Sequence, residues 1–293
     1  MSGLFVGLTT LDVVQLVDRM PAPDEKIRGL DDMLAAGGPA TNAAVAFARE
    51  AATTTLVTRV PDGPAWDLIR GDLATCGVSV RRAATQPGRR VTVASIMVTR
   101  ATGDRAVIST GDRSHVDTPP PDDDLGEIDV RDYDVVLIDG HEADLARTVV
   151  ERAREAGVPV VLDGGSWKPA TPDLLPHVDA AVVSSAFAPD GVAAPAAVLD
   201  FLLEAGPRFA AVTRGGSSVL YKTRQGAGEV RPPSVDVVDT LGAGDFFHGG
   251  FAAHVARHGL TEVTLVDALA HGARVAASSI GSFGTRAWLG QRP

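Results

Sequence analysis

Cysteine and lysine are both scarce in this chain of 293 residues. The single cysteine, Cys76, excludes an internal disulfide and any metal cluster built from several cysteines, as expected of a protein in a reducing compartment. Lysine occurs only at Lys26, Lys168 and Lys222, so arginine supplies nearly all of the positive charge. None of these lysines follows a glycine, and the sequence therefore contains no Walker A phosphate-binding loop.

Long basic runs and long apolar runs are absent as well. The formal net charge of −10 argues against a nucleic acid or an anionic membrane surface as partner, because both require a basic footprint. No stretch of about 18 consecutive apolar residues could span a membrane, and the N-terminus lacks the basic and apolar regions of a secretory leader. These absences predict a cytoplasmic protein that acts on a small molecule.

The chain has enough hydrophobic content, 45%, to build a full core. Short β-branched runs alternate with alanine-rich stretches of helical periodicity, and several of the runs are apolar on both faces. Such a pattern predicts a doubly wound, mainly parallel α/β sheet flanked by helices. The expected strands are Leu4–Leu8, Thr54–Val57, Val135–Ile138, Val158–Leu162, Ala180–Val183 and Ala210–Val212, and the expected helices are Thr41–Ala51, Leu145–Ala156 and Pro195–Ala205.

Two more polar segments, approximately 13–34 and 90–110, interrupt this alternation. Both carry alternating polar and apolar residues, and 102–104 has the composition of a hairpin turn. They predict a small β-sheet lid on one edge of the core within a single domain, 1–293. The proline- and aspartate-rich stretch 119–124 is expected to be a solvated connector without a chemical role.

A glycine-rich loop near the C-terminus reads Asp-Thr-Leu-Gly-Ala-Gly-Asp over 239–245. It is preceded by Val235–Val238, which predicts a strand, and followed by an apolar run that predicts a buried helix. The start of such a helix presents free backbone N–H groups, and its dipole favours negative charge. Gly242, Ala243 and Gly244 are therefore expected to form an anion hole, because glycine lets the backbone approach phosphate oxygens.

Asp245 stands directly after this expected anion hole. A carboxylate there could accept the proton of an attacking hydroxyl, which is the role that phosphoryl transfer needs besides positioning and charge neutralisation. The alternative is an ordinary helix-capping acid in a tight turn. A dinucleotide-binding fingerprint does not fit, because Phe247 occupies the place of its third glycine.

A second polar set lies near the start of the chain. Asp12 follows the first expected strand, and Gly38 and Asn42 belong to a Gly-Gly-Pro-Ala-Thr-Asn stretch that opens a helix. A carboxylate, exposed glycine backbone and a carboxamide suit a ligand with many hydroxyl groups. The alternative is a simple turn with Thr41 or Asn42 as the helix cap.

These two constellations, in this order and at these distances, resemble the signatures of the PfkB or ribokinase-like family of carbohydrate kinases along essentially the whole chain. Within the family, the stretches 7–18 and 237–245 look most like ketohexokinase, and 247–249 is similar to sulfofructose kinase. The resemblance implies a ribokinase-like fold that transfers the γ-phosphoryl of ATP to a sugar hydroxyl, with a ketose as the expected acceptor. It also implies Mg²⁺, in some members a monovalent cation such as K⁺, and a homodimer formed through the lid.

Residue by residue, the resemblance implies that Asp245 is the catalytic base beside the anion hole and that Asp12, Gly38 and Asn42 bind the sugar. It assigns the nucleotide to Thr213, Gly215, Gly216 and Arg105. Lys26 aligns with a lysine that meets an anionic substituent of the substrate.

Two departures from the family pattern concern the metal and the sugar. The stretch 183–188 has no carboxylate where many members carry Asn-x-x-Glu, which organises the water shell of Mg²⁺, so the metal ligands stay unknown. Pro39 stands where ketohexokinase has an asparagine that touches the sugar. A nucleoside kinase, a sugar-phosphate kinase, and a catalytically silent relative that binds a sugar or nucleotide therefore stay open as alternatives.

Overall fold

A computed structural model of the chain describes residues 1–50, 53–110, 128–192 and 194–290. The expected connector at 119–124 lies outside these ranges. None of the helices within them has the length and apolar character that a bilayer-spanning segment requires.

The core of the fold is a nine-stranded sheet, counted over the described residues, in the order β13-β12-β11-β10-β9-β8-β1-β4-β5. The strands from β11 to β5 pair in parallel, while β12 and β13 form an antiparallel edge. The strands are β1 (Ser2–Val6), β4 (Thr53–Thr58), β5 (Val78–Arg82), β8 (Val135–Ile138), β9 (Val160–Gly164), β10 (Ala180–Ser184), β11 (Phe209–Arg214), β12 (Ser217–Thr223) and β13 (Ala227–Val230).

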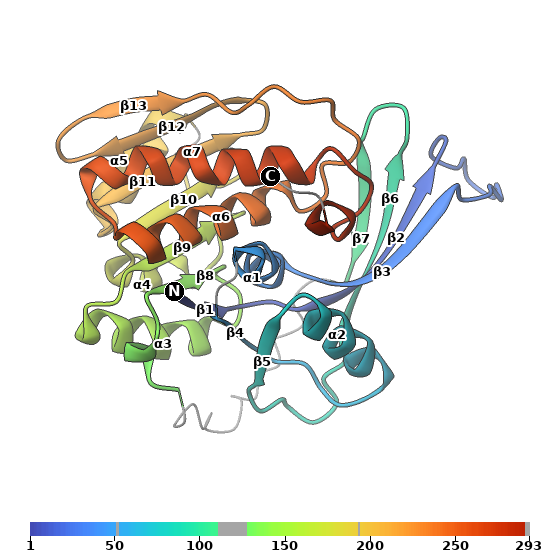
Figure 1. Cartoon of the computed structure of the whole chain (residues 1–293), viewed down its shortest axis with the longest axis horizontal. Helices are drawn as coiled ribbons and strands as arrows, with labels where there is room; N and C mark the ends of the chain where they lie inside the picture. Colours follow the sequence, from blue (N-terminus) through green and yellow to red (C-terminus); the bar gives the residue numbers. More distant parts are fainter. Residues whose placement is uncertain (51–52, 111–127, 193, 291–293) are drawn as a thin grey trace.

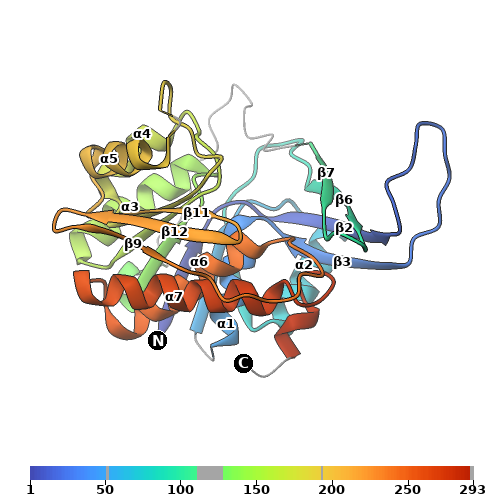
Figure 2. The ribbon, with the colours of Figure 1, turned by 90° about the horizontal axis from the view of Figure 1, so that it is seen from above.

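Helices cover both faces of this sheet (Figures 1 and 2). One face carries α1 (Pro39–Arg49), α2 (Pro64–Thr75), α6 (Ala243–His258) and α7 (Glu262–Ser279), and the other carries α3 (Ala143–Ala156), α4 (Thr171–Leu174) and α5 (Pro195–Ala205). Short 3-10 turns lie at Val130–Asp132, Leu175–His177 and Ala287–Gly290. The predicted doubly wound α/β architecture is confirmed.

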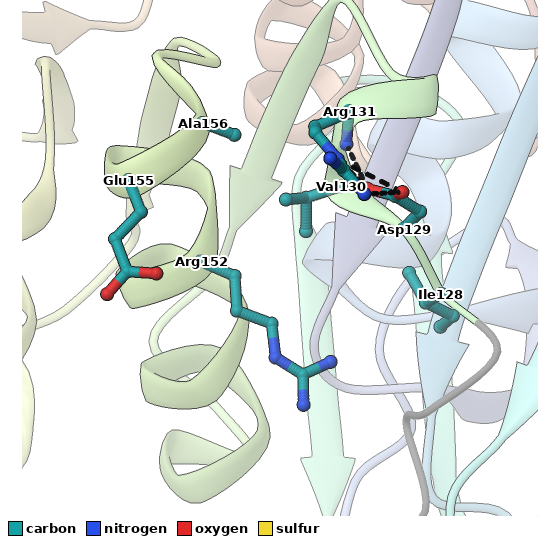
Figure 3. Close-up of a pocket in the computed structure, with 7 residues that line it drawn as sticks. All are labelled: Ile128, Asp129, Val130, Arg131, Arg152, Glu155 and Ala156. Atoms are coloured by element: carbon teal, nitrogen blue, oxygen red, sulfur yellow. Dashed lines mark hydrogen bonds and ion pairs between the residues drawn. The ribbon is translucent and has the colours of Figure 1, made fainter.

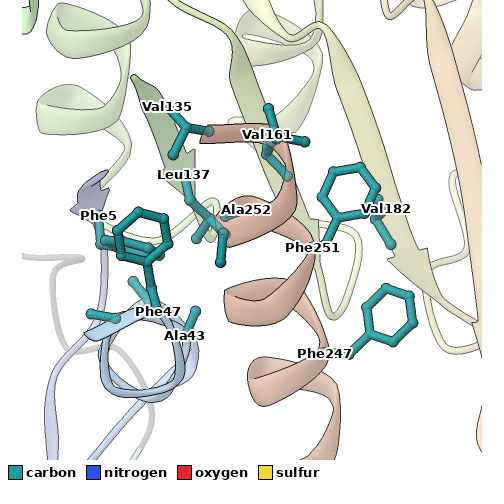
Figure 4. Packing of buried hydrophobic residues seen from close by; sticks show 14 of the residues in the cluster. Phe5, Ala43, Phe47, Val135, Leu137, Val161, Val182, Phe247, Phe251 and Ala252 are labelled. Atoms are coloured by element: carbon teal, nitrogen blue, oxygen red, sulfur yellow. The ribbon is translucent and has the colours of Figure 1, made fainter. Parts of the chain in front are cut away.

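A buried aromatic and aliphatic cluster joins α1 and α6 to the sheet (Figure 4). Phe5 of β1 meets Phe47 of α1 edge to face, with 5.2 Å between ring centroids, and Phe251 of α6 packs in the same cluster. All three side chains are fully buried, and each contributes about 1.5–3 kcal/mol of transfer free energy. The two helices that carry the candidate site residues are therefore anchored to one core.

A separate four-stranded sheet, in the order β3-β2-β6-β7, projects from the edge of the body (Figure 1). Its strands are β2 (Thr10–Val17), β3 (Asp31–Gly37), β6 (Thr92–Thr99) and β7 (Arg105–Ser109). Val14, Ala94 and Ile96 are buried on its inner face, against Leu241 and Phe283 of the body. The predicted lid and its hairpin turn at 102–104 are both present.

One predicted strand is wrong. Val235–Val238 forms no ladder, although it is rich in β-branched residues. The segment follows Pro232 and Pro233, and the backbone N–H of Val238 donates to the carbonyl of Ile280 at 2.8 Å instead of to a neighbouring strand. Val237 is 49% exposed and lines a cavity described below, so the apolar run covers a binding surface.

Two consecutive glycines let α6 pack closely on its neighbours. A Cβ at Gly249 would lie 2.3 Å from the carbonyl oxygen of Ala43 in α1, and one at Gly250 would lie 2.7 Å from a methyl group of Val275 in α7. The axis of α6 therefore approaches α1 at a distance that no side chain would permit.

We predict that Gly249→Ala lowers the free energy of unfolding by about 1–3 kcal/mol, because backbone atoms of α1 cannot rotate away from the new methyl group. Gly71→Ala in α2 is the matched control, since its Cβ would meet nothing within 4 Å. Helix propensity alone should make that control about 1 kcal/mol more stable. Urea unfolding of both variants checks the prediction, and equal effects would contradict it.

Candidate active site

The carboxyl ends of the parallel strands meet at one edge of the sheet, where ligands bind in open α/β folds. Asp139 follows β8 directly, Asp163 lies in β9, and Ser184 ends β10. The starts of α1 and α6 reach the same edge, since Asn42 of α1 contacts Asp245 of α6. Segments far apart in the sequence therefore converge on a single site.

The glycine loop forms the start of α6 as predicted. Gly242 is the N-cap with φ 73°, a left-handed conformation that glycine adopts without strain. The N–H groups of Gly244 and Asp245 fall in the first turn, where no earlier carbonyl of the helix can accept them. The N–H of Ala243, which the sequence also assigned to the anion hole, instead donates to the carbonyl of Thr240 at 3.3 Å. A Cβ at Gly244 would meet nothing within 4 Å, so the backbone is open to an incoming anion.

Asp239 holds this loop in place. Its two carboxylate oxygens accept hydrogen bonds from the backbone N–H groups of Leu241 and Gly284, each at 2.9 Å. The side chain is buried, so both bonds are shielded from water and fix the position of the loop.

Asp245 is held by a single side-chain contact. The amide of Asn42 donates to Oδ2 of Asp245 at 2.9 Å, and the described residues offer no hydrogen-bond donor to Oδ1. Burial, and after it the neighbouring Asp163 carboxylate, raise the pKa of Asp245 to about 7, although the Asn42 hydrogen bond opposes both effects. One oxygen is thus oriented while the other is free to accept a proton near neutral pH.

The second polar set, from the N-terminal part of the chain, lies around the start of β2. Asp12 is 5% exposed, and the hydroxyl of Thr10 donates to its Oδ1 at 2.6 Å. A Cβ at Gly37 would lie 2.0 Å from the Asp12 carboxylate, so glycine is required there to seat the acid. Burial raises the pKa of Asp12, while the Thr10 hydrogen bond and nearby Arg286 lower it.

Gly38 has a backbone reason for being glycine. Its φ is 101°, and a Cβ would lie 2.2 Å from the carbonyl oxygen of Leu8. The Gly38 carbonyl accepts the N–H of Asn42 at 2.9 Å, which starts α1. The predicted sugar-binding set of Asp12, Gly38 and Asn42 therefore shares one wall of the site.

A cavity of about 510 Å³ opens on the other side of the anion hole. The predicted nucleotide residues Thr213, Gly215 and Gly216 line it, together with Gly244. Further along, its walls are small and apolar, formed by Ala273, Ala276, Ala277 and Ile280. This arrangement suits a nucleoside triphosphate. Its phosphates would lie against the glycine backbone, and its base would enter the apolar slot.

Arg105 reaches this cavity from the lid. Its guanidinium donates to the hydroxyl of Thr240 at 2.6 Å and so lies beside the loop that precedes α6. Lys26 is placed differently, since it is exposed on the connection from β2 to β3, beyond the outer end of β2. The structure brings Arg105 to the other candidate residues but does not bring Lys26 there.

Three buried residues of the site escaped prediction from the sequence. Asp139 accepts the N–H groups of Leu8, Ala40 and His141 at 2.8–3.1 Å, and so ties the loop after β1 to the start of α1. The other two, Asp163 and His248, face each other beneath the first turn of α6, 3.2 Å apart. The sequence did carry a signal for the two carboxylates, because each acid directly follows a predicted strand, Val135–Ile138 or Val158–Leu162.

No protein ligands for a metal ion can be assigned. The described residues contain no group of three His, Cys, Asp or Glu side chains that could hold one. Where many family members carry Asn-x-x-Glu, the hydroxyl of Ser184 instead donates to the carbonyl of Gly165 at 2.8 Å and accepts the N–H of Ala186.

A second hollow, of about 470 Å³, lies at the opposite edge of the sheet (Figure 3). It is lined by residues 128–131, which precede β8, and by the end of α3. Arg131 there is exposed and pairs with neighbouring Asp129. The polar side chains that line this hollow are all at least partly exposed.

Comparison with known proteins identifies the family. The description "pfkB family carbohydrate kinase" matches residues 3–290. The chain is a PfkB family carbohydrate kinase. It is similar to a ribokinase of Bacillus subtilis, at 26% identity over 98% of this chain and 95% of that protein. It is also similar to an ATP-dependent ribose-1-phosphate kinase of Halopiger xanaduensis, at 30% identity over 93% of this chain and 91% of that protein.

Solved structures agree with this fold. An Agrobacterium tumefaciens protein superposes with a TM-score of 0.82 at 26% identity, covering 97% of this chain and 92% of its own. Arabidopsis thaliana ribokinase, solved with ribose and ATP, superposes with a TM-score of 0.75 at 23% identity, covering 97% and 93%. This PfkB kinase is therefore a phosphotransferase that acts on an alcohol group of a sugar.

The comparisons change the emphasis within the family. Mouse ketohexokinase is a more distant relative, at 24% identity over 95% of both chains, whereas most of the named relatives are ribokinases. The likeness of the two motifs to ketohexokinase therefore does not carry over to the chain as a whole.

We predict that Asp245→Asn stabilises this kinase at pH 8 more than at pH 5. The folded-state pKa of about 7 lies above the ordinary value of 3.8, so the folded protein binds the extra proton and loses stability as pH rises from about 4 to about 7. Asparagine removes that loss. Because Asp245 retains partial solvent access, we expect the stabilisation at pH 8 to exceed that at pH 5 by roughly 1–2 kcal/mol.

Unfolding by urea at both pH values measures this difference. Asp236→Asn is the matched control, because it removes the same charge from an exposed loop position. If Asp245→Asn changed the free energy of unfolding equally at pH 5 and pH 8, the raised pKa of the Asp245 carboxyl would be contradicted.

Proposed function

We propose that this kinase transfers the γ-phosphoryl of ATP to a hydroxyl of a free sugar, with Asp245 as the base. The observation that carries the proposal is the pairing of Asn42 with Asp245 in the first turn of α6, beside the open backbone of Gly244. The proposed acceptor wall, proton acceptor and anion hole then lie next to one another. Such an arrangement supplies the positioning and charge stabilisation that phosphoryl transfer requires.

Each side of the site has a defined task in this proposal. Asp12, Gly38 and Asn42 orient the sugar, and Asp245 takes the proton of the attacking hydroxyl through its free oxygen. Thr213, Gly215, Gly216 and Arg105 hold the nucleotide, while the N–H groups at the start of α6 receive the charge that develops on the transferred group. Mg²⁺ bound to the ATP phosphates would neutralise part of their charge. A monovalent cation stays a prediction.

We propose a pentose such as ribose as the first acceptor to test and a ketose such as fructose as the second. Ribokinases from Bacillus subtilis and Arabidopsis thaliana, at 26% and 28% identity, support the pentose. The motif at 7–18 supports the ketose. A third acceptor, ribose 1-phosphate, follows from the Halopiger relative, and Lys26 would be its partner if the lid brought that side chain inward.

An ADP-release assay over ribose, deoxyribose, fructose, a nucleoside and ribose 1-phosphate decides among these acceptors. We expect Asp245→Asn to lower kcat by about 10²–10⁴-fold without loss of ATP binding, since a general base contributes a factor of that size. kcat/KM of the unaltered enzyme should rise with pH through about 7, because the base acts only when ionised.

Full turnover by Asp245→Asn would contradict the base assignment. Binding of sugar and ATP without turnover of any acceptor would favour a silent binding protein. A preference for ribose 1-phosphate that survives Lys26→Ala would remove Lys26 from the substrate site.

We also propose a homodimer formed through the outer face of the lid. Leu34, Val13, Ser95 and Ile108 stand opposite one another in a row across the four strands, on the face away from the body. Leu34 is 53% exposed and Ile108 is 68% exposed, and such a patch is unusual on a monomer. An isologous contact between two copies would cover it.

We expect the purified protein to sediment as a dimer and Ile108→Lys to shift it towards monomer, because a buried unpaired charge opposes the contact. Val263→Lys, at a 79% exposed position of α7, is the matched control and should leave the dimer intact. A wild-type monomer at micromolar concentration would contradict this proposal.

A further inference from the structure

His248 lies one turn after Asp245 in α6, with only 2% of its surface exposed. Nothing in the proposed reaction uses it. Its Nδ1 is 2.7 Å from the carbonyl oxygen of Gly244, in the first turn of α6, and its Nε2 is 2.9 Å from the carbonyl oxygen of Val182 in β10. The ring therefore connects the anion-hole turn to the central sheet.

The two contacts define the charge on this ring. Carbonyl oxygens only accept hydrogen bonds, so each ring nitrogen must carry a proton to satisfy its neighbour. A neutral imidazole would direct one lone pair at a carbonyl lone pair in a site without access to water. The geometry therefore calls for an imidazolium, and a buried cation needs an anionic partner.

Asp163 is that partner. Its Oδ2 lies 3.2 Å from Nδ1 of His248, and neither side chain is more than 4% exposed. Among the described residues this buried Oδ2 has no hydrogen-bond partner, so the charge on the nearby imidazole is what offsets its burial. Burial raises the pKa of Asp163, and His248 is the strongest opposing influence, ahead of Lys168 and His141.

We propose that Asp163 and His248 form a buried ion pair that positions the catalytic base. The pair holds the first turn of α6 against β9 and β10, and it sets the charge that the Asp245 carboxyl experiences. This inference rests on the proposed role of Asp245 as the base of the kinase. Neither residue touches the acceptor or the nucleotide in this account, so both act through Asp245.

Asp245 is surrounded by groups of both signs. Asp163 on β9 and Asp139 after β8 raise its pKa, while His248 on α6 and the Asn42 amide on α1 lower it. Lys168 and His141, on the loops after β9 and β8, act on Asp163 in turn. The two members of the ion pair therefore push the pKa of Asp245 in opposite directions, so their separate removal has opposite expected effects.

The test compares the pH dependence of kcat/KM in Asp163→Asn and His248→Asn. Loss of the Asp163 charge should move the acidic limb to lower pH, and loss of the His248 charge should move it to higher pH, each by roughly 0.5–1.5 units. The double variant should return close to the unaltered enzyme. Asparagine is chosen at both positions because it removes the charge and keeps a polar side chain.

The proposal would be overturned if the acidic limb moved in the same direction in both variants. It would also be overturned if kcat fell in both variants while the acidic limb stayed where it is in the unaltered enzyme. Either result would make the pair a structural contact. If His248→Asn does not fold, Asp163→Asn alone still decides, because the proposal requires a downward shift.

A spectrum of the histidine nitrogens in the unaltered protein provides an independent readout. With His248→Asn or His248→Gln used for assignment, we expect His248 to show two protonated ring nitrogens at pH 7. A neutral tautomer there would overturn the ion pair. This measurement needs no turnover, so its failure is distinct from failure of the kinase assignment, which Asp245→Asn tests separately.

Discussion

The hydrogen bond from Asn42 to Asp245 is the contact on which the rest of the site depends. It joins the starts of α1 and α6, two helices that are separated by most of the chain. The contact is possible because Gly249 lets α6 approach the backbone of α1, and because Phe47 and Phe251 anchor both helices in one core (Figure 4). Through it, the proposed acceptor wall and the proposed phosphate-binding turn are brought next to each other. Small residues at a helix crossing thus determine where a proton acceptor stands.

The second constraint is the number of carboxylates buried at one edge of the sheet. Asp139 is balanced by three backbone N–H groups, Asp163 faces a histidine, and Asp245 has only one carboxamide. Asp245 differs from the other two in being only partly buried, and its surroundings raise its pKa to about 7. Further hydrogen bonds to its carboxylate would lower that pKa and so weaken the proposed base.

Much of this could be predicted from the sequence where the signal is local. The β-branched runs predicted the central strands, and the contiguous stretch 239–245 predicted the glycine turn that opens α6 with Asp245 in its first turn. The strand predicted over Val235–Val238 was wrong because β-branched content does not say whether a neighbouring strand is available for pairing. Two prolines also precede the segment. Asp139 and Asp163 were missed because an acid after a strand means little until the topology places the strand ends together. His248 reads as one more residue of a buried helix, and its partner belongs to another element. The choice of sugar depends on walls assembled from distant segments, so the motif resembling ketohexokinase pointed to a member that the whole chain resembles less.

The central claim, that buried and incompletely compensated charge makes Asp245 a base near neutral pH, can be measured without any substrate. Carbon-13 labelling of the aspartate carboxyls, with Asp245→Asn to assign the missing signal, reports the titration of this side chain in the free protein. The account predicts a midpoint near pH 7. A midpoint near pH 4, the ordinary value for an aspartate, would contradict it.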